Sequence, residues 1–323
     1  SKTDLLLACQ FPWGRELQSR PASPADEPMR YGSAFHLAMS KLLLGKPFKW
    51  KPIAAAFSVE NDISWKELKE HVGEAHSVLS TWLGGKNPWK LNFLRDAKAR
   101  TEQAFAYNVL KKTARGTRPP TEKEHRYVGI GADEFPGTAD LVIDQIKRRD
   151  APDLLILDHK TGEFVDLPLE SGQMLSLGLA GAKRVGAKRV ALATFHAARG
   201  GVPTVYADEV EMDALKHHAE ELKDAWKNIG TGQLRPGPHC SICPAQAECP
   251  AFANALAKLE AGALNTPEGI GALHQAIGVL IPLAEKLKEE KIRPFIRKFG
   301  AATRPDGKMV ILKKHPQRNL SMS

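Results

Sequence analysis

An apolar strand that ends in two charged residues constrains this chain more than any other feature. Residues 154–157 are Leu-Leu-Ile-Leu, and Asp158, His159 and Lys160 follow directly. Because side chains alternate along a strand with a period of two, Asp158 and Lys160 project from the same face. Charged groups at the end of a core strand are costly unless they are paired or bind a ligand. We therefore expect a functional site at this strand end, with an exposed Asp–Lys ion pair as the alternative.

A second carboxylate lies one predicted strand earlier, where Asp140 follows Gly137, Thr138 and Ala139. Two carboxylates, those of Asp140 and Asp158, offer hard oxygen ligands to Mg²⁺ or Mn²⁺ and leave coordination positions for water and a phosphate oxygen. The main-chain carbonyl of His159 is a further candidate ligand. Lys160 would then lie beside the metal, where its ammonium group could orient an attacking water or help to deprotonate it.

A histidine upstream of both strands could complete this coordination shell. His36 ends the segment Gly-Ser-Ala-Phe-His at residues 32–36, which has the pattern of a helix. A neutral imidazole is a good metal ligand beside two carboxylates. Taken alone, a histidine of this kind is more often an ordinary residue of a helix face, so the interpretation depends on the residues around it.

The remaining pattern predicts a mixed α/β fold of the α+β type. Residues 170–184 have the periodicity of a helix that lies between two strands. A capping box at Ser64 predicts a helix that continues to about Leu83, and residues 38–100 are expected to form a mostly helical insertion. Short apolar or alternating runs predict strands near residues 101–109, 127–130, 138–143, 154–158 and 190–195.

Four ordered motifs resemble the RecB-like branch of the PD-(D/E)xK nuclease superfamily. The pattern of that family is a G-x-x-x-H helix, a G-x-x-D strand, a D-x-K strand and a helix with Q-x-x-x-Y. The first three motifs stand here at residues 32–36, 137–140 and 158–160, and the fourth begins at Gln173. The fourth motif departs from the pattern, because Leu177 stands where the family has a tyrosine.

The resemblance implies a restriction-endonuclease-like core, in which helices flank a central mixed sheet, and Mg²⁺- or Mn²⁺-dependent hydrolysis of DNA. It favours an exonuclease that acts in recombination, repair, or phage or CRISPR DNA processing. Gln173 would contact the substrate or steady the site, and the missing tyrosine hydroxyl puts part of that role in doubt. Glu102 is a further candidate, with an ordinary edge carboxylate as the alternative. The alternative function is a catalytically inactive DNA-binding scaffold.

The four cysteines form one remote residue and one close group, namely Cys9 and then Cys240, Cys243 and Cys249. Four soft thiolates suit zinc or an iron–sulfur cluster, whereas disulfides fit an intracellular chemistry less well. A remote cysteine with a C-terminal trio is similar to the iron–sulfur branch of the family, which includes AddB-type repair nucleases and CRISPR-associated adaptation nucleases. That resemblance implies a structural 4Fe–4S cluster, and zinc, with His239 as a further ligand, is the alternative.

The resemblance covers residues 1–255, which we expect to form the nuclease domain. Residues 256–323 would then be a C-terminal extension with a helix that begins at Thr266 and a basic hairpin around residues 305–307.

Charge and composition favour a nucleic-acid partner. The formal net charge is +9 and the pI is near 9.3, as expected for a chain that neutralises phosphates, although a solvated basic tail would give the same charge. We expect DNA that is single-stranded or has free ends. No Gly-x-x-x-x-Gly-Lys-Ser/Thr loop occurs, so a helicase, recombination or CRISPR partner would be a separate chain. No apolar stretch reaches the ~18 residues of a membrane span, which predicts a cytoplasmic protein without membrane contact.

Overall fold

The computed structural model describes residues 27–119, 127–146, 148, 150–162 and 167–229, together with two short strands near the C-terminus. The chain divides into two compact units, Ser1–Leu234 and Arg235–Ser323. The predicted domain boundary at residue 255 and the predicted helix from Thr266 lie outside the described residues. None of the helices in the described ranges is long and apolar enough to span a membrane.

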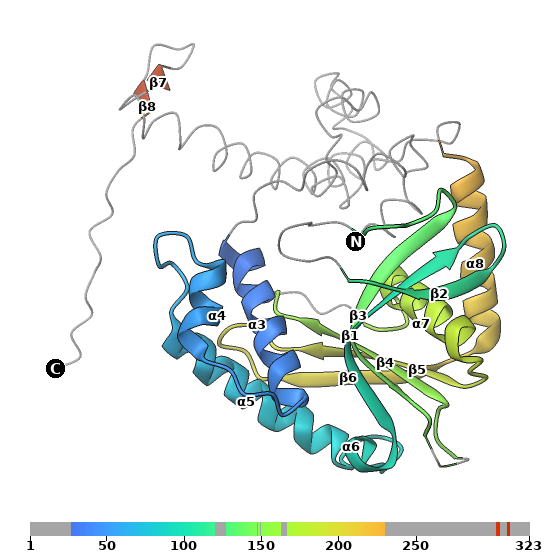
Figure 1. Cartoon of the computed structure of the whole chain (residues 1–323), viewed down its shortest axis with the longest axis horizontal. Helices are drawn as coiled ribbons and strands as arrows, with labels where there is room; N and C mark the ends of the chain where they lie inside the picture. Colours follow the sequence, from blue (N-terminus) through green and yellow to red (C-terminus); the bar gives the residue numbers. More distant parts are fainter. Residues whose placement is uncertain are drawn as a thin grey trace, which may run out of the picture. The chain divides into compact units, whose positions relative to one another are not determined.

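A six-stranded mixed sheet forms the centre of the first unit, in the order β2-β1-β3-β4-β5-β6 (Figure 1). The strands β4 and β5 run parallel, and the other neighbouring pairs run antiparallel. A parallel pair needs a crossover connection, which the helix α7 (Gly172–Val185) provides. The predicted mixed α/β core is therefore confirmed. The strands are β1 (Lys98–Asn108), β2 (Thr113–Thr117), β3 (Glu134–Asp144), β4 (Leu154–Lys160), β5 (Val190–His196) and β6 (Thr204–Val210).

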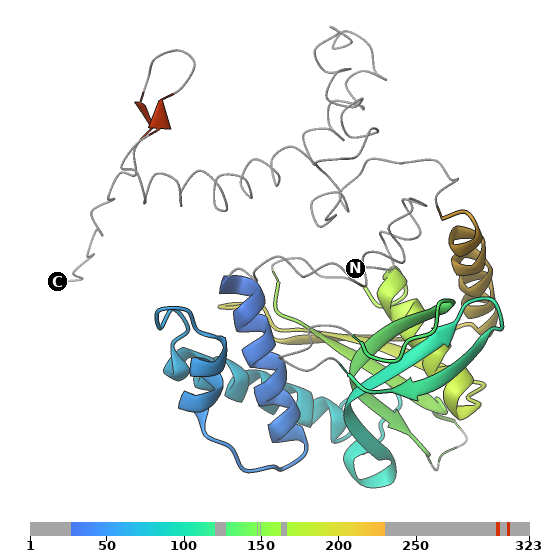
Figure 2. The same cartoon turned by 45° about the horizontal axis from the view of Figure 1, so that its top comes forward.

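Helices cover both faces of the sheet (Figures 1 and 2). On one face lie α3 (Glu27–Leu43), α4 (Trp50–Phe57), α5 (Trp65–Leu83) and the short α6 (Phe93–Asp96), and on the other lie α7 and α8 (Met212–Lys227). Because strand side chains alternate, β4 contributes to both cores. Leu155 and Leu157 pack against the α3 layer, whereas Leu154 and Ile156 pack against the α7 layer.

Local signals in the sequence explain where two of these helices begin and end. The Ser64 side chain accepts a hydrogen bond from the main-chain N–H of Glu67 at 3.4 Å and caps α5, as the capping box predicts. Ser171 caps α7 in the same way, and Gly186 ends it with a positive φ of 74°, a conformation that glycine adopts without steric cost.

Some expectations about the strands were wrong or incomplete. No strand forms at residues 127–130, because the chain bends at residues 128 and 129, where Gly129 has a φ of +70°. The edge strands β2 and β6 and the helix α8 were not predicted. The expected C-terminal hairpin is present as the antiparallel pair β7 (Ala302–Thr303) and β8 (Met309–Val310), which brackets the predicted turn.

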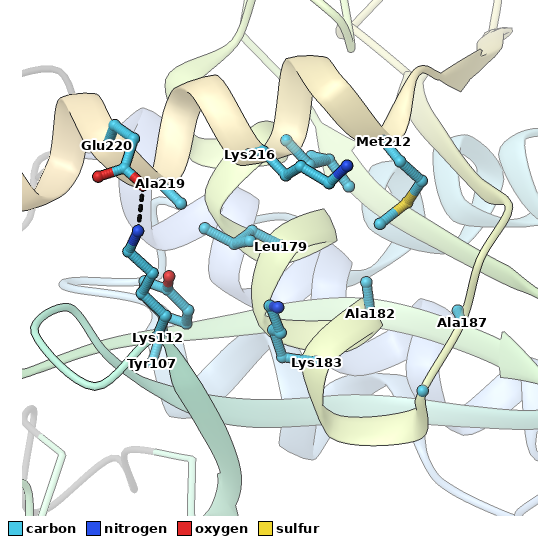
Figure 3. Close-up of a pocket in the computed structure, with 12 residues that line it drawn as sticks. Tyr107, Lys112, Leu179, Ala182, Lys183, Ala187, Met212, Lys216, Ala219 and Glu220 are labelled. Atoms are coloured by element: carbon cyan, nitrogen blue, oxygen red, sulfur yellow. Dashed lines mark hydrogen bonds and ion pairs between the residues drawn. The ribbon is translucent and has the colours of Figure 1, made fainter.

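The contact between α7 and α8 leaves a cavity of about 250 Å³ (Figure 3). Apolar side chains such as Leu179 and Met212 form part of its lining, and Lys112 forms an ion pair with Glu220 at one end. Tyr107 is buried there, and its hydroxyl has no hydrogen-bond partner among the described residues. This cavity contains none of the site residues predicted from the sequence.

Candidate active site

Neighbouring strands bring three carboxylates to one level of the sheet. The register that pairs Leu141 with Leu157 brings Asp140 of β3 next to Asp158 of β4. The register of β1 and β3 places Glu102 opposite Asp140. Asp140 and Asp158 are buried, with exposed fractions of 6% and 4%, so each charge needs a partner.

Asp140 links the sheet to the helix α3 and to the neighbouring strand β4. Its Oδ1 atom lies 2.9 Å from Nδ1 of His36 on α3. Its Oδ2 atom accepts a hydrogen bond of 2.5 Å from the main-chain N–H of His159 on the neighbouring strand. These two contacts fix both oxygens of the carboxylate, so Asp140 is oriented before any ligand arrives.

Asp158 and Lys160 form the second half of the site. The Lys160 Nζ atom lies 2.8 Å from Asp158 Oδ2 and donates a hydrogen bond of 3.1 Å to Oε1 of Gln173 in the first turn of α7. As the period of two predicts, Asp158 and Lys160 lie on the same face of β4 as Ile156, which packs on the α7 layer. The lysine is thus held between a carboxylate of the sheet and an amide of the helix.

The strand β1 changes conformation at Glu102. This residue has a φ of +52°, which residues other than glycine rarely adopt. The alternation of side chains along β3 is interrupted at the same level. Leu141 packs on the α3 layer, whereas Ala139, two residues earlier, packs on the α7 layer. Backbone strain of this kind costs about 1–3 kcal/mol and persists only where the surroundings enforce it.

The His36–Asp140 pair is ionised in the absence of a metal. Burial disfavours the charged imidazole, but the nearby Asp140 carboxylate outweighs it and raises the pKa of His36 to about 9. For Asp140, burial likewise favours the neutral form, yet His36 and the His159 N–H hold its pKa well below the ordinary value. At neutral pH the pair is therefore a cation beside an anion.

The other two carboxylates are harder to ionise. Burial, followed by the charge of Asp140, raises the pKa of Asp158 to about 6, although Lys160 acts in the opposite direction. Burial and Asp140 likewise raise the pKa of Glu102 to about 7. Three carboxylates that repel one another in a buried cluster gain stability when a cation enters.

His159 provides a test of whether a divalent cation fits this cluster. Its ring is buried against Phe35 and Phe195, and neither ring nitrogen has a hydrogen-bond partner among the described residues. Burial lowers its pKa to about 4, so the ring is neutral and its lone pair is available. Ligand atoms of His36, Asp140 and His159 all lie within 4.8 Å of one another. The donor set therefore fits a divalent cation.

The predicted residues His36, Asp140, Asp158 and Lys160 are thus close together, and Gln173 contacts Lys160. Glu102 was a weaker candidate, and its position opposite Asp140 follows from strand register. The ring of His159 was not foreseen as a ligand, since only its carbonyl was considered. The period of two places that ring on the opposite face of β4 from Asp158. On that face α3 packs against the sheet, and His36 of α3 lies beside the His159 ring.

Leu177 lies one turn after Gln173 on α7 and is buried against β3. A Cβ atom built on Gly137 would lie only 2.9 Å from Cδ2 of Leu177, so the leucine packs directly on the glycine backbone. The four predicted cluster ligands, Cys9, Cys240, Cys243 and Cys249, and the alternative ligand His239 lie outside the described residues.

Fold and site together define a nuclease-type hydrolase. The chain belongs to the PD-(D/E)XK nuclease superfamily, whose family pattern matches residues 1–250. No curated protein matches the chain. Among solved structures, one described as "Crystal structure of SSO0001" is 15% identical and is matched over 78% of this chain and 97% of that chain, with a TM-score of 0.30. So distant a likeness carries no argument about fold or function.

Proposed function

We propose that this chain is a Mg²⁺- or Mn²⁺-dependent deoxyribonuclease that removes nucleotides from DNA ends. The observation that carries the proposal is the buried cluster in which Asp140 is held by His36 and Asp158 is held by Lys160. Such a cluster binds a cation, and a cation beside an ammonium group attracts a phosphodiester. Membership of the superfamily supports hydrolysis as the reaction.

Asp140, Asp158 and His36 would hold the cation, with the main-chain carbonyl of His159 as a further ligand. A bound Mg²⁺ or Mn²⁺ supplies positive charge against the phosphate and a source of hydroxide at neutral pH. The ring of His159 is a competing ligand, because its buried nitrogens lack hydrogen-bond partners in the described ranges. Oxygen-rich sites favour Mg²⁺ and Mn²⁺, and an imidazole in place of Asp158 would shift the preference towards softer ions.

Lys160 would orient the attacking water and stabilise negative charge on the phosphate in the transition state. Its ammonium group is positioned by Asp158 on one side and Gln173 on the other, so little reorganisation is needed when the substrate binds. Gln173 contributes as a positioning residue and as a contact to the substrate. Glu102 contributes a third carboxylate whose raised pKa of about 7 makes proton exchange near neutral pH easy.

The cysteines Cys9, Cys240, Cys243 and Cys249 are proposed to hold a structural 4Fe–4S cluster, with zinc as the alternative. Three of them lie near the end of the range matched by the family pattern, and Cys9 lies near its beginning. A cluster would close a loop of more than two hundred residues and restrict the unfolded chain. The nuclease domain would extend to residue 255, with residues 256–323 as a basic extension and helicase, recombination or CRISPR components as separate partners in the cytoplasm.

Cleavage of linear and circular DNA tests the proposal. Linear DNA labelled at the 5′ or the 3′ end is incubated with anaerobically purified protein and Mg²⁺ or Mn²⁺, beside a circular DNA of the same sequence. We expect loss of label from linear DNA only, and loss of this activity in Asp158→Ala and Lys160→Ala. Lys216→Ala, an exposed lysine of α8, is the matched control. DNA binding without cleavage by the wild type would favour the inactive scaffold instead.

A further inference from the structure

A cavity of about 280 Å³ adjoins the candidate active site on the α7 side of the sheet. Its size is close to the lower limit of small-molecule sites, roughly 300 Å³. It shares no lining residue with the cavity between α7 and α8 (Figure 3). Its lining includes Phe105, Tyr127, Phe135, Thr138, Gln173 and Leu177.

Two residues connect this cavity to the reacting groups. Gln173 lines the cavity and accepts a hydrogen bond from Lys160 at 3.1 Å. Thr138 also lines it and stands two residues before Asp140 on β3. A molecule whose phosphate lies beside Lys160 would therefore have its neighbouring groups at the mouth of the cavity.

The walls suit a flat aromatic ring with polar edges. Phe105, Phe135 and Tyr127 provide aromatic surface, and Leu177 adds an apolar wall. The Tyr127 hydroxyl lies 2.8 Å from the Thr138 hydroxyl, so a pair of hydroxyls faces the same space. The Gln173 amide accepts the Lys160 hydrogen bond through its oxygen, so its N–H groups are the donors that it can offer to a ligand.

We propose that this cavity binds the nucleobase next to the scissile phosphate, which makes an unpaired nucleotide the substrate. The inference rests on the proposed nuclease function and adds the class of DNA on which it acts. Aromatic side chains stack with any base, whereas a base inside a duplex is paired and stacked and cannot enter a side cavity. Gln173 then donates to the edge of the base while its oxygen holds Lys160. Leu177 stands where the family has a tyrosine, and the Tyr127 hydroxyl would take the place of the missing hydroxyl in the cavity.

The test uses single-stranded DNA with a defined change at one base. One set of oligonucleotides carries an abasic residue at the nucleotide that is released, and cleavage is followed with Mg²⁺. We expect the abasic residue to lower kcat/KM about tenfold or more, as the loss of a stacked base predicts. A second set carries 2-aminopurine, whose fluorescence decreases on stacking, and is titrated with the full-length protein in EDTA so that binding is measured without cleavage.

Two variants locate the effect in the cavity. Phe135→Ala and Tyr127→Leu should reduce the discrimination against the abasic substrate and the fluorescence change, while the Mg²⁺ affinity stays the same. Phe48→Ala removes a half-buried aromatic residue from the α3 layer and should behave as the wild type. Thermal unfolding of each variant separates loss of fold from loss of the cavity.

The outcomes test the base-binding cavity and the nuclease function separately. Cleavage that is equally fast on abasic and intact strands, with an unchanged 2-aminopurine signal, overturns the base-binding cavity and leaves the nuclease function intact. A wild type that cleaves no DNA overturns the nuclease function, and the 2-aminopurine titration in EDTA still decides whether the cavity takes a base. A duplex with blunt ends that is cut as fast as a single strand also contradicts the inference.

Discussion

Raising the pH from about 6.5 to about 8.5 should strengthen Mg²⁺ binding by the metal-free protein about a hundredfold. The cause is His36, whose pKa is raised to about 9 by its ion pair with Asp140. A metal ligand must be the neutral imidazole, so each cation that binds displaces one proton.

The sign and size of the effect follow from the raised pKa values of His36, Glu102 and Asp158. A raised pKa means that His36 keeps its proton below pH 9, and the metal competes with that proton over this whole range. Each pH unit below the pKa therefore weakens binding about tenfold. Asp158, with a pKa of about 6, and Glu102, with a pKa of about 7, add further displaced protons at lower pH, so a single proton is released per cation only above about pH 8.

Isothermal titration calorimetry in buffers of different ionisation enthalpy measures both the affinity and the number of protons released. In His36→Asn the affinity should fall and the pH dependence above about pH 8 should disappear, which leaves only the weaker dependence near pH 7 that Glu102 contributes. His217→Asn, an exposed histidine of α8, should keep the behaviour of the wild type. A Mg²⁺ affinity that does not change with pH in this range would refute the role of His36 as a ligand.

Three further predictions concern stability and cofactor. Gly137→Ala should lower the free energy of unfolding by about 1 kcal/mol, because its methyl group would lie 2.9 Å from Leu177. Gly73→Ala in α5, where nothing lies within 4 Å, should raise the free energy of unfolding by about 0.5–1 kcal/mol. Chemical denaturation measures both changes. Ser64→Ala should cost about 1 kcal/mol through loss of the N-cap of α5 in the same assay, and an unchanged stability would contradict the capping role. Anaerobically purified protein should be brown and lose its colour in Cys243→Ser, whereas a colourless, zinc-containing protein would favour the alternative metal.

The sequence predicts those helices and strands whose own residue pattern identifies them. The strand β4 is apolar from Leu154 to Leu157, where both of its faces are buried, and α5 carries its own cap. The edge strand β2 has the sequence Thr-Ala-Arg-Gly-Thr, which lacks an apolar alternation, so its pairing with β1 depends on the neighbouring strand. The run at 127–130 has strand-like residues, yet a turn at Gly129 prevents pairing.

In the candidate site, too, some residue positions follow from the sequence and others depend on tertiary structure. Asp158 and Lys160 share a face because of strand geometry, and sequence reasoning is sufficient for that pair. The position of Glu102 opposite Asp140 depends on strand register and on a positive φ, neither of which a single sequence specifies. The approach of the His159 ring to His36, with centroids 5.5 Å apart, depends on how α3 packs on the sheet.

The most direct test of the metal-dependent site is single-turnover cleavage of end-labelled DNA by Asp140→Asn over a range of Mg²⁺ concentrations. Asparagine keeps the shape of the side chain and an oxygen for the His159 N–H, but it removes the charge. We predict a loss of cleavage of at least about a hundredfold with DNA binding retained. Asp208→Asn, an exposed residue on β6, should cut at the rate of the wild type. Undiminished cleavage by Asp140→Asn would contradict the account.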